Sequence, residues 1–227
     1  INIDALPLDR VVSAISPTTI CQGGTVTLQI TNAQAGINYQ ILDQMNNVVS
    51  SIQVGSGADL SIITNALTTT SNQLSVRAVN ASTGCTLSLT TVQNITVQQA
   101  PTLANAGVDL ERCGSGSITL AGNLPAIGTG TWSIISGTGG SFANISLNNT
   151  QFTGAAGQVY TLAWTISNGV CPVSTDNVIV TVTTPPTVFA GTNESICENN
   201  IFNFSTQSIG ASASNFSSLN WTHTGLG

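Results

Sequence analysis

The sequence predicts an all-β protein built from tandem antiparallel β-sandwiches, and three observations support this. A seven-residue phrase occurs three times, as INIDALP at 1–7, ITVQQAP at 95–101 and VTVTTPP at 180–186. Apolar and polar residues alternate in most segments between these phrases, which is the pattern of half-buried strands. Gly, Asn and Pro separate the alternating segments, and these residues favour tight turns over helix.

The repeated phrase marks the end of a domain. In each copy a β-branched, polar, β-branched triplet opens the phrase, and a proline stands at its seventh position. Proline lacks the amide hydrogen that a strand ladder needs, so the strand must end before it. The copies begin at residues 1, 95 and 180, so the repeat periods are 94 and 85 residues, which suits small β-sandwiches.

The domain boundaries follow from these repeats. A second phrase, AGVDLERC at 106–113, returns as AGTNESIC at 190–197 with the same spacing from Ala-Gly to Cys. We expect successive domains to be arranged end to end in an elongated array, because only a few residues separate one closing strand from the next domain. The predicted parts are the end of a preceding repeat at 1–6, sandwiches at 7–100 and 101–185, and the first part of a third, incomplete repeat at 186–227.

The first sandwich is expected to begin with a short strand around Val11-Val12. The stretch DQMNN at 43–47 separates two alternating runs, and it predicts a hairpin because Asn tolerates positive φ. Gly84 is expected in the turn before Cys85. Alternation predicts the other strands at 25–30, 37–41, 48–54, 60–63, 74–79 and within 87–97.

The second sandwich has a clearer pattern. Asn168-Gly169 is the strongest hairpin signal in the chain, and it is expected to turn a central strand into Val170-Cys171. Trp132 is expected to point inward. Residues spaced by two predict the buried face of that central strand, namely Tyr160, Leu162, Trp164 and Ile166. Strands are predicted at 117–121, 128–135, 160–166 and 177–182, and in the third repeat at 201–204 and from 219.

Composition limits the function classes. Charged residues make up only 5% of the chain, with nine acidic residues, three arginines and no lysine, so the net charge is −6. This balance argues against a nucleic-acid partner, because phosphate contacts need basic groups. The sequence holds no apolar run long enough to span a membrane.

The five cysteines follow the repeats, with one early and one late cysteine in each complete repeat. This arrangement predicts disulfides Cys21–Cys85 and Cys113–Cys171, and hence an oxidising compartment. Cys197 is the early cysteine of the third repeat, so we expect it to be unpaired within this chain. Buried free thiols are the alternative. A zinc site is disfavoured because there is no C-x₂-C pair and only one histidine.

The sequence predicts no catalytic, cofactor or metal site. The absence of lysine excludes a Schiff base and a P-loop, and His223 is more simply an outward polar strand residue than part of a triad. Asp109 and Glu111, near a domain boundary, could offer oxygen ligands to Ca²⁺. Because Asn193 and Ser195 replace them in the next repeat, solvated surface charge is the favoured interpretation.

Several motifs resemble a known family. AGxDxxxC at 106–113, GTWS at 130–133 and YTLxWTISNGxCP at 160–172 resemble the PKD-like/Ig-like repeats of very large Bacteroidota cell-surface proteins. The first repeat, with ICQGGTVTL at 20–28, resembles a sister repeat found beside them. The resemblance implies export by type IX secretion, an extracellular cell-surface location and a stalk or adhesin role, in some cases in gliding motility. It provides no catalytic motif.

Two functions are compatible with these features. The first is a non-enzymatic structural or adhesive segment of a long extracellular filament or stalk. Its partners would be neighbouring repeats of the same chain, with surface polysaccharide, other cells or secretion and motility machinery beyond them. The alternative is a set of carbohydrate-binding accessory modules of a secreted hydrolase. Exposed aromatic residues on one sheet face would favour the alternative, whereas buried tryptophans favour the structural role.

Overall fold

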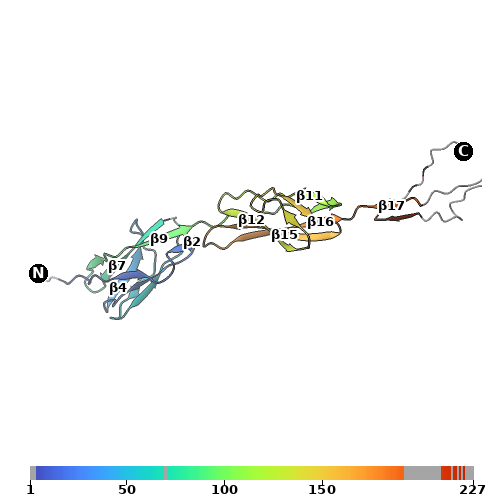
Figure 1. Ribbon diagram of the computed structural model, residues 1–227. Helices are drawn as coiled ribbons and strands as arrows, with labels where there is room; N and C mark the ends of the chain where they lie inside the picture. The colour runs from blue at the N-terminus through green and yellow to red at the C-terminus, as the bar shows by residue number, and fades with distance from the viewer. Residues whose placement is uncertain are drawn as a thin grey trace, which may run out of the picture. The chain divides into compact units, whose positions relative to one another are not determined.

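The computed structural model describes residues 4–68, 71–191, 211–215, 217, 218, 220 and 222, and the regular elements of this part of the chain are all strands (Figure 1). The prediction of an all-β fold is therefore confirmed. The chain divides into two compact units. The first comprises Ile1–Ala104, Leu124–Thr131 and Thr165–Thr175, and the second comprises Asn105–Asn123, Trp132–Trp164 and Asp176–Gly227. The boundaries drawn from the sequence repeats, at 7–100 and 101–185, stay predictions.

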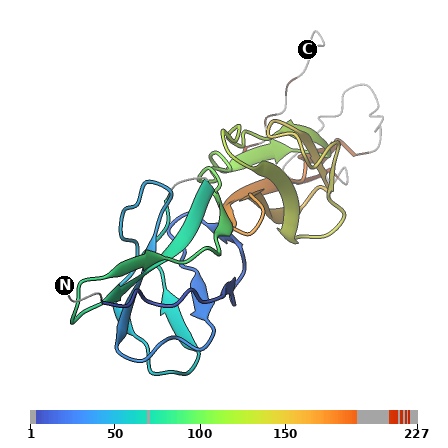
Figure 2. The ribbon, with the colours of Figure 1, turned by 90° about the vertical axis from the view of Figure 1, so that its left-hand side faces the viewer.

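The first unit contains two sheets (Figure 2). One has the order β1-β3-β6, and the other has the order β2-β9-β7-β4-β5, with β8 also paired to β7. The strands are β1 Val12–Ala14, β2 Thr19–Cys21, β3 Thr27–Ile30, β4 Ile37–Leu42, β5 Gln53–Val54, β6 Leu60–Ile63, β7 Ser71–Asn80, β8 Thr86–Ser88 and β9 Gln93–Gln98.

The apolar faces of both sheets form one core. In β3 the side chains of Leu28 and Ile30 are buried, whereas those of the intervening polar residues are partly exposed, as the alternation predicts. Tyr39 of β4 and Leu74 of β7 belong to the same cluster. Each such large side chain contributes about 1.5–3 kcal/mol when buried, so the alternating pattern accounts for the sandwich.

The hairpin predicted at 43–47 is present. The amide of Asp43 donates to the carbonyl oxygen of Asn47 at 3.0 Å, and Asn46 has a φ of 63°. One carboxylate oxygen of Asp43 accepts hydrogen bonds from the amides of Met45 and Asn47, each at 2.8 Å. The side-chain amide of Asn47 also donates to this carboxylate, and it is the main cause that lowers the pKa of Asp43.

The second unit is built on two further sheets, with the orders β10-β16-β15-β12 and β11-β14-β13. The first residues of β12 and β16 and the last residues of β15 belong to the first unit. The strands are β10 Leu110–Cys113, β11 Gly116–Thr119, β12 Thr129–Ser136, β13 Ser141–Phe142, β14 Gln151–Gly154, β15 Gln158–Ser167 and β16 Ser174–Thr183.

Aromatic side chains fill the core of the second unit. The rings of Trp132 and Trp164 lie 5.0 Å apart, and those of Phe152 and Tyr160 meet edge to face at the same distance. The indole nitrogen of Trp132 donates to the Leu147 carbonyl oxygen at 3.1 Å. The burial predicted for Trp132 and for the central strand is confirmed, since Tyr160, Leu162, Trp164 and Ile166 are all buried.

Two strand pairs are parallel, a feature that the alternating pattern did not predict. β2 runs parallel to β9, and β10 runs parallel to β16. In the first unit Pro17 interrupts the opening segment, so β1 joins one sheet while β2 crosses to the other and runs alongside the closing strand. The closing strands themselves end at Gln98 and Thr183, before Pro101 and Pro186 as expected.

Alternation found most of the strands. β2, β10, β13, β14, β17 and β18 were not predicted, and the segment 87–97 is split into β8 and β9. In the third repeat, β17 Thr187–Phe189 pairs antiparallel with β18 Ser212–Ser214. The strands predicted at 201–204 and from 219 lie wholly or largely outside the described residues, as do Cys197 and His223.

Candidate functional site

Cys21 is held beside the closing strand of its own repeat. It is the last residue of β2, and it lies opposite Gln98 in the parallel β2–β9 pair. The next amide, that of Gln22, donates to the Gln98 carbonyl oxygen at 2.7 Å. A turn follows in which the amide of Gly24 donates back to the Cys21 carbonyl oxygen at 2.8 Å. These backbone hydrogen bonds fix the position of Cys21 independently of the disulfide.

Cys171 lies in the turn between β15 and β16. The chain reverses at Asn168-Gly169, where Gly169 has a φ of 55°, and the Cys171 amide donates to the Asn168 carbonyl oxygen at 3.1 Å. This confirms the hairpin that the Asn-Gly pair predicts. The side chain of Cys171 is buried, with 5% of its surface exposed.

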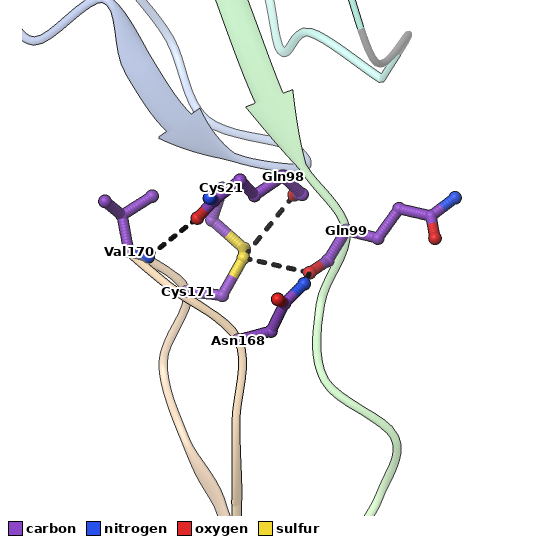
Figure 3. Close-up of a disulfide and its surroundings, with 6 residues drawn as sticks. All are labelled: Cys21, Gln98, Gln99, Asn168, Val170 and Cys171. Atoms are coloured by element: carbon purple, nitrogen blue, oxygen red, sulfur yellow. Dashed lines mark hydrogen bonds between the residues drawn. A yellow bond between two sulfur atoms is a disulfide. The ribbon is translucent and has the colours of Figure 1, made fainter. Parts of the chain in front are cut away.

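These two cysteines form a disulfide (Figure 3). Their Cα atoms are 4.8 Å apart, within the range that a disulfide spans, and they are separated by 150 positions in the sequence. Both belong to the first compact unit, although Cys21 comes from the first sequence repeat and Cys171 from the second. We call the disulfide, together with Gln98, Gln99, Asn168 and Val170, the clasp.

Hydrogen bonds surround the disulfide. The side-chain oxygen of Gln98 accepts a hydrogen bond from the Val170 amide at 2.8 Å. The side-chain nitrogen of Asn168 donates to the Gln99 carbonyl oxygen at 2.7 Å. Gln98, the last residue of the closing strand, and Gln99 are thus bonded to the hairpin through a side-chain and a backbone group, and Figure 3 shows these groups around the sulfur atoms. Each neutral hydrogen bond of this kind contributes about 0.5–1.5 kcal/mol.

Gly169 permits this close approach. A Cβ atom added at this position would collide with the side-chain oxygen of Gln98 and would lie 2.6 Å from the nitrogen of the same amide. Its positive φ is also unfavourable for residues with a side chain. The Asn-Gly pair therefore makes the turn and also leaves room for Gln98.

The sulfur of Cys171 lies close to two carbonyl oxygens, 3.4 Å from that of Gln98 and 3.3 Å from that of Gln99. A disulfide sulfur carries no proton, so in the oxidised protein these are close contacts and not hydrogen bonds. After reduction the Cys171 thiol has a carbonyl acceptor within reach. The backbone carbonyl oxygens of Gln98 and Gln99 therefore both contact this sulfur.

The observed pairing corrects the prediction of Cys21–Cys85 and Cys113–Cys171. Cys85 and Cys113 are free, with Cys85 half-buried and Cys113 exposed. Cys21 lies opposite Gln98, in the strand that closes its own repeat, and the Cys171 sulfur contacts the carbonyl oxygen of the same residue, which closes the repeat before that of Cys171. The Cys85 sulfur lies elsewhere, 4.0 Å from the Asp4 carbonyl oxygen, so the two cysteines of the first repeat do not meet. Their spacing gives no sign of this, because both schemes join an early cysteine to a late one.

The other residues considered for chemistry form no site. Asp109 accepts a hydrogen bond from the Ile179 amide at 2.9 Å, which connects the start of β10 to β16, and Glu111 is exposed. Among the described residues, no three His, Cys, Asp or Glu side chains gather where they could hold a metal ion. The same part of the chain has no helix long and apolar enough to cross a membrane.

Fold and clasp together define a tandem β-sandwich protein in which a disulfide joins one sequence repeat to the next. No protein-family model matches the chain, and no curated protein matches it either.

Solved structures give distant similarities. The chain is similar to the fibronectin(III)-like modules of Clostridium thermocellum CbhA, with 12% identity, coverage of 77% of this chain and 95% of that one, and a TM-score of 0.38. It is similar to the I-band fragment I67-I69 of titin, with 11% identity, coverage of 81% and 68%, and a TM-score of 0.44. It is also similar to cadherin domains 1–5 of protocadherin gamma B2, with 12% identity, coverage of 81% and 41%, and a TM-score of 0.40.

Proposed function

We propose that this chain is a non-enzymatic structural and adhesive segment of a long extracellular protein, in which clasped β-sandwich repeats form a stalk. The observation that carries the proposal is the Cys21–Cys171 bond between different sequence repeats. A disulfide confined to one repeat would stabilise that repeat alone. When the chain is pulled, a bond across repeats carries the tension directly from one cysteine to the other, so the strands between them are not loaded.

Composition supports an extracellular location. A disulfide persists in oxidising compartments, and small sandwiches with few charges gain stability from such crosslinks. The scarcity of Lys, Arg, Asp and Glu leaves few groups for acid–base or nucleophilic catalysis. The resemblance of the second repeat to PKD-like repeats of Bacteroidota surface proteins gives the proposal its finer form: a cell-surface adhesin exported by type IX secretion, of the kind that serves gliding motility.

The alternative, a carbohydrate-binding accessory module, needs exposed aromatic rings. Trp132 and Trp164 are each only 1% exposed, and their indole nitrogens donate to backbone carbonyl oxygens. Both rings are therefore committed to the core and cannot stack on a sugar. This burial favours the structural role.

Two measurements test the proposed function. An antibody raised against the chain is expected to label intact, unpermeabilised cells of the source organism, with an antibody against a cytoplasmic protein as the control. Labelling only after permeabilisation would refute the surface location. On a glycan array we expect no selective binding by the purified chain, and selective, saturable binding to one glycan class would favour carbohydrate recognition instead.

A further inference from the structure

The repeated phrase places three residues in equivalent positions. Asp4, Gln98 and Thr183 are each the fourth residue of their copy of the phrase. Gln98 is the residue around which the clasp is built. The surroundings of Asp4 and Thr183 can therefore be compared with those of Gln98, atom by atom.

Cys113 occupies the place beside Thr183 that Cys21 occupies beside Gln98. Each cysteine ends a short strand that runs parallel to a closing strand, with Cys21 opposite Gln98 and Cys113 opposite Thr183. The amide after Cys113, that of Gly114, donates to the Thr183 carbonyl oxygen at 2.9 Å, as the amide after Cys21 does to that of Gln98 at 2.7 Å. The backbone geometry of the early cysteine is thus repeated in the second unit.

Cys85 occupies the place beside Asp4 that Cys171 occupies beside Gln98. Its sulfur lies 4.0 Å from the Asp4 carbonyl oxygen, as the Cys171 sulfur lies 3.4 Å from that of Gln98. Both late cysteines follow a ten-residue strand, β7 or β15. Both also follow a glycine with positive φ, 75° at Gly84 and 55° at Gly169.

We propose that Cys85 and Cys113 are each one half of a further clasp. Cys113 forms a disulfide with the late cysteine of a following repeat of this kind, and Cys85 forms one with the early cysteine of a preceding repeat. A hollow beside Cys113, lined also by Gln158, Thr183 and Pro186, offers space for the incoming hairpin. This inference rests on the equivalence of the three positions and does not depend on the adhesive role.

The resulting bonds overlap along the chain. The loop closed by Cys21 and Cys171 contains both Cys85 and Cys113, which are free in this structure and whose proposed partners would lie outside the loop. Each repeat would thus be joined by one disulfide to the repeat before it and by another to the repeat after it. Breaking one bond would leave its neighbours closed.

Only the backbone part of the clasp is repeated. Gln98 accepts a hydrogen bond from Val170 through its side-chain amide, whereas Thr183 is too short to reach in the same way. Asp4 keeps a side-chain oxygen acceptor at its position. We therefore expect the bond at Cys113 to form at a position set by the strand register and the carbonyl oxygen, without the side-chain hydrogen bond.

The chemistry needs an external oxidant, and a small disulfide such as oxidised glutathione supplies it. The thiolate of one cysteine attacks the small disulfide and releases one glutathione thiolate. The thiolate of the partner cysteine then attacks the mixed disulfide and releases the second. Two protein thiols lose two protons and two electrons, and one oxidised glutathione becomes two reduced molecules.

The test for Cys113 is a lengthened chain in which residues 101–185 are inserted a second time after Pro185. After oxidation with oxidised glutathione, free thiols are alkylated and disulfide peptides are mapped by mass spectrometry. We expect the native Cys21–Cys171 bond and a new bond between Cys113 of the first copy and Cys171 of the inserted copy. In the natural chain Cys113 is expected to be alkylated completely, and in the lengthened chain the first-copy Cys113 is expected to be protected.

Two matched variants identify which copy reacts. Cys113→Ser in the first copy should leave Cys171 of the inserted copy free, whereas Cys113→Ser in the inserted copy should leave the new bond intact. A bond between Cys113 and Cys171 within the inserted copy, or a free Cys171 there, would overturn the proposal for Cys113. The native Cys21–Cys171 bond serves as the internal control for correct folding.

The test for Cys85 is independent of the first one. Residues 101–179 are joined in front of Ile1, so that residues 1–6 close the added repeat. We expect Cys113 of the added repeat to bond to Cys85, and Cys85→Ser to leave that added cysteine open to alkylation. Alkylation of Cys85 as complete as in the natural chain would overturn the proposal for Cys85.

Discussion

The Cys21–Cys171 bond is expected to shorten the distance over which the chain extends under force. When the ends are pulled, tension passes from residue 21 directly to residue 171, and the intervening residues stay slack. The bond encloses 150 residue steps, each spanning up to about 3.6 Å. About 540 Å of chain therefore cannot extend while the bond is intact. The remaining 20 steps before Cys21 and 56 after Cys171 allow only about 270 Å.

Single-molecule force spectroscopy, with handles on residues 1 and 227, measures this difference. The oxidised chain should reach its full length at about 270 Å, and the Cys171→Ser variant should gain about 540 Å more. Reduction with a thiol should convert the first behaviour into the second during one experiment, because the disulfide is cleaved by exchange. Cys85→Ser is the matched control, and it should extend like the oxidised natural chain because Cys85 is free.

Two results would refute the reasoning. If the oxidised natural chain extended to the same length as Cys171→Ser, the bond would not join residues 21 and 171. If Cys85→Ser lengthened the chain, the cysteine pairing would be the within-repeat scheme that the structure replaces. That scheme would hide two separate stretches, from 21 to 85 and from 113 to 171, and its total extension would lie between the lengths expected for the oxidised natural chain and for Cys171→Ser.

Three further predictions concern the clasp, the core and one surface carboxylate. Gly169→Ala should lower the free energy of unfolding by about 1–3 kcal/mol in chemical denaturation, because its Cβ collides with Gln98. Gln98→Ala should recover part of this loss. If the loss is equal with and without Gln98→Ala, the collision is not its cause. Trp132→Ala should cost about 3–5 kcal/mol by the same measurement, whereas the exposed Leu103→Ala should cost little, and similar losses for both would contradict the assigned core. The Thr90 hydroxyl, which donates to Asp9 at 2.7 Å, holds the pKa of Asp9 below its ordinary value, so Thr90→Val should raise that pKa in an NMR titration. Since the folded-state pKa is the lower one, the stabilisation from Asp9 should be complete above its unfolded pKa of about 3.9 and disappear as pH falls through the folded value. An unchanged Asp9 pKa in the variant would exclude the Thr90 hydroxyl as the main cause, because the Thr90 amide still donates to Asp9.

Local patterns explain why much of the fold could be predicted. Strand alternation depends on neighbours two positions apart, so the buried faces of β3 and β15 can be seen in the sequence. The turns at Asn46 and Gly169 follow from the few residues that accept positive φ. β2 has three residues, all of intermediate burial, and β13 has only two, so neither shows a buried face by itself.

The direction of the opening strands could not be predicted in the same way. A short opening strand can join the sheet of the strand next to it in the sequence, or it can pair with the closing strand. The choice depends on contacts between residues about 80 positions apart, such as Cys21 and Gln98. Alternation fixes which face of a strand is buried, but it carries no information about the partner strand. The two parallel pairs were therefore missed although the strands around them were found.

The sequence by itself determined the repeats, the all-β class, the closing strands before Pro101 and Pro186 and the early and late positions of the cysteines. Only the tertiary structure decided which cysteines meet. Disulfide formation needs two Cα atoms within about 7 Å, and that distance depends on which closing strand each cysteine lies against. Cys21 lies beside Gln98 through strand register, and Cys171 reaches the same residue through a hairpin that begins about 70 positions later. No local sequence pattern predicts the contact between Cys21 and Cys171, because it arises from the packing of segments that are distant in the chain.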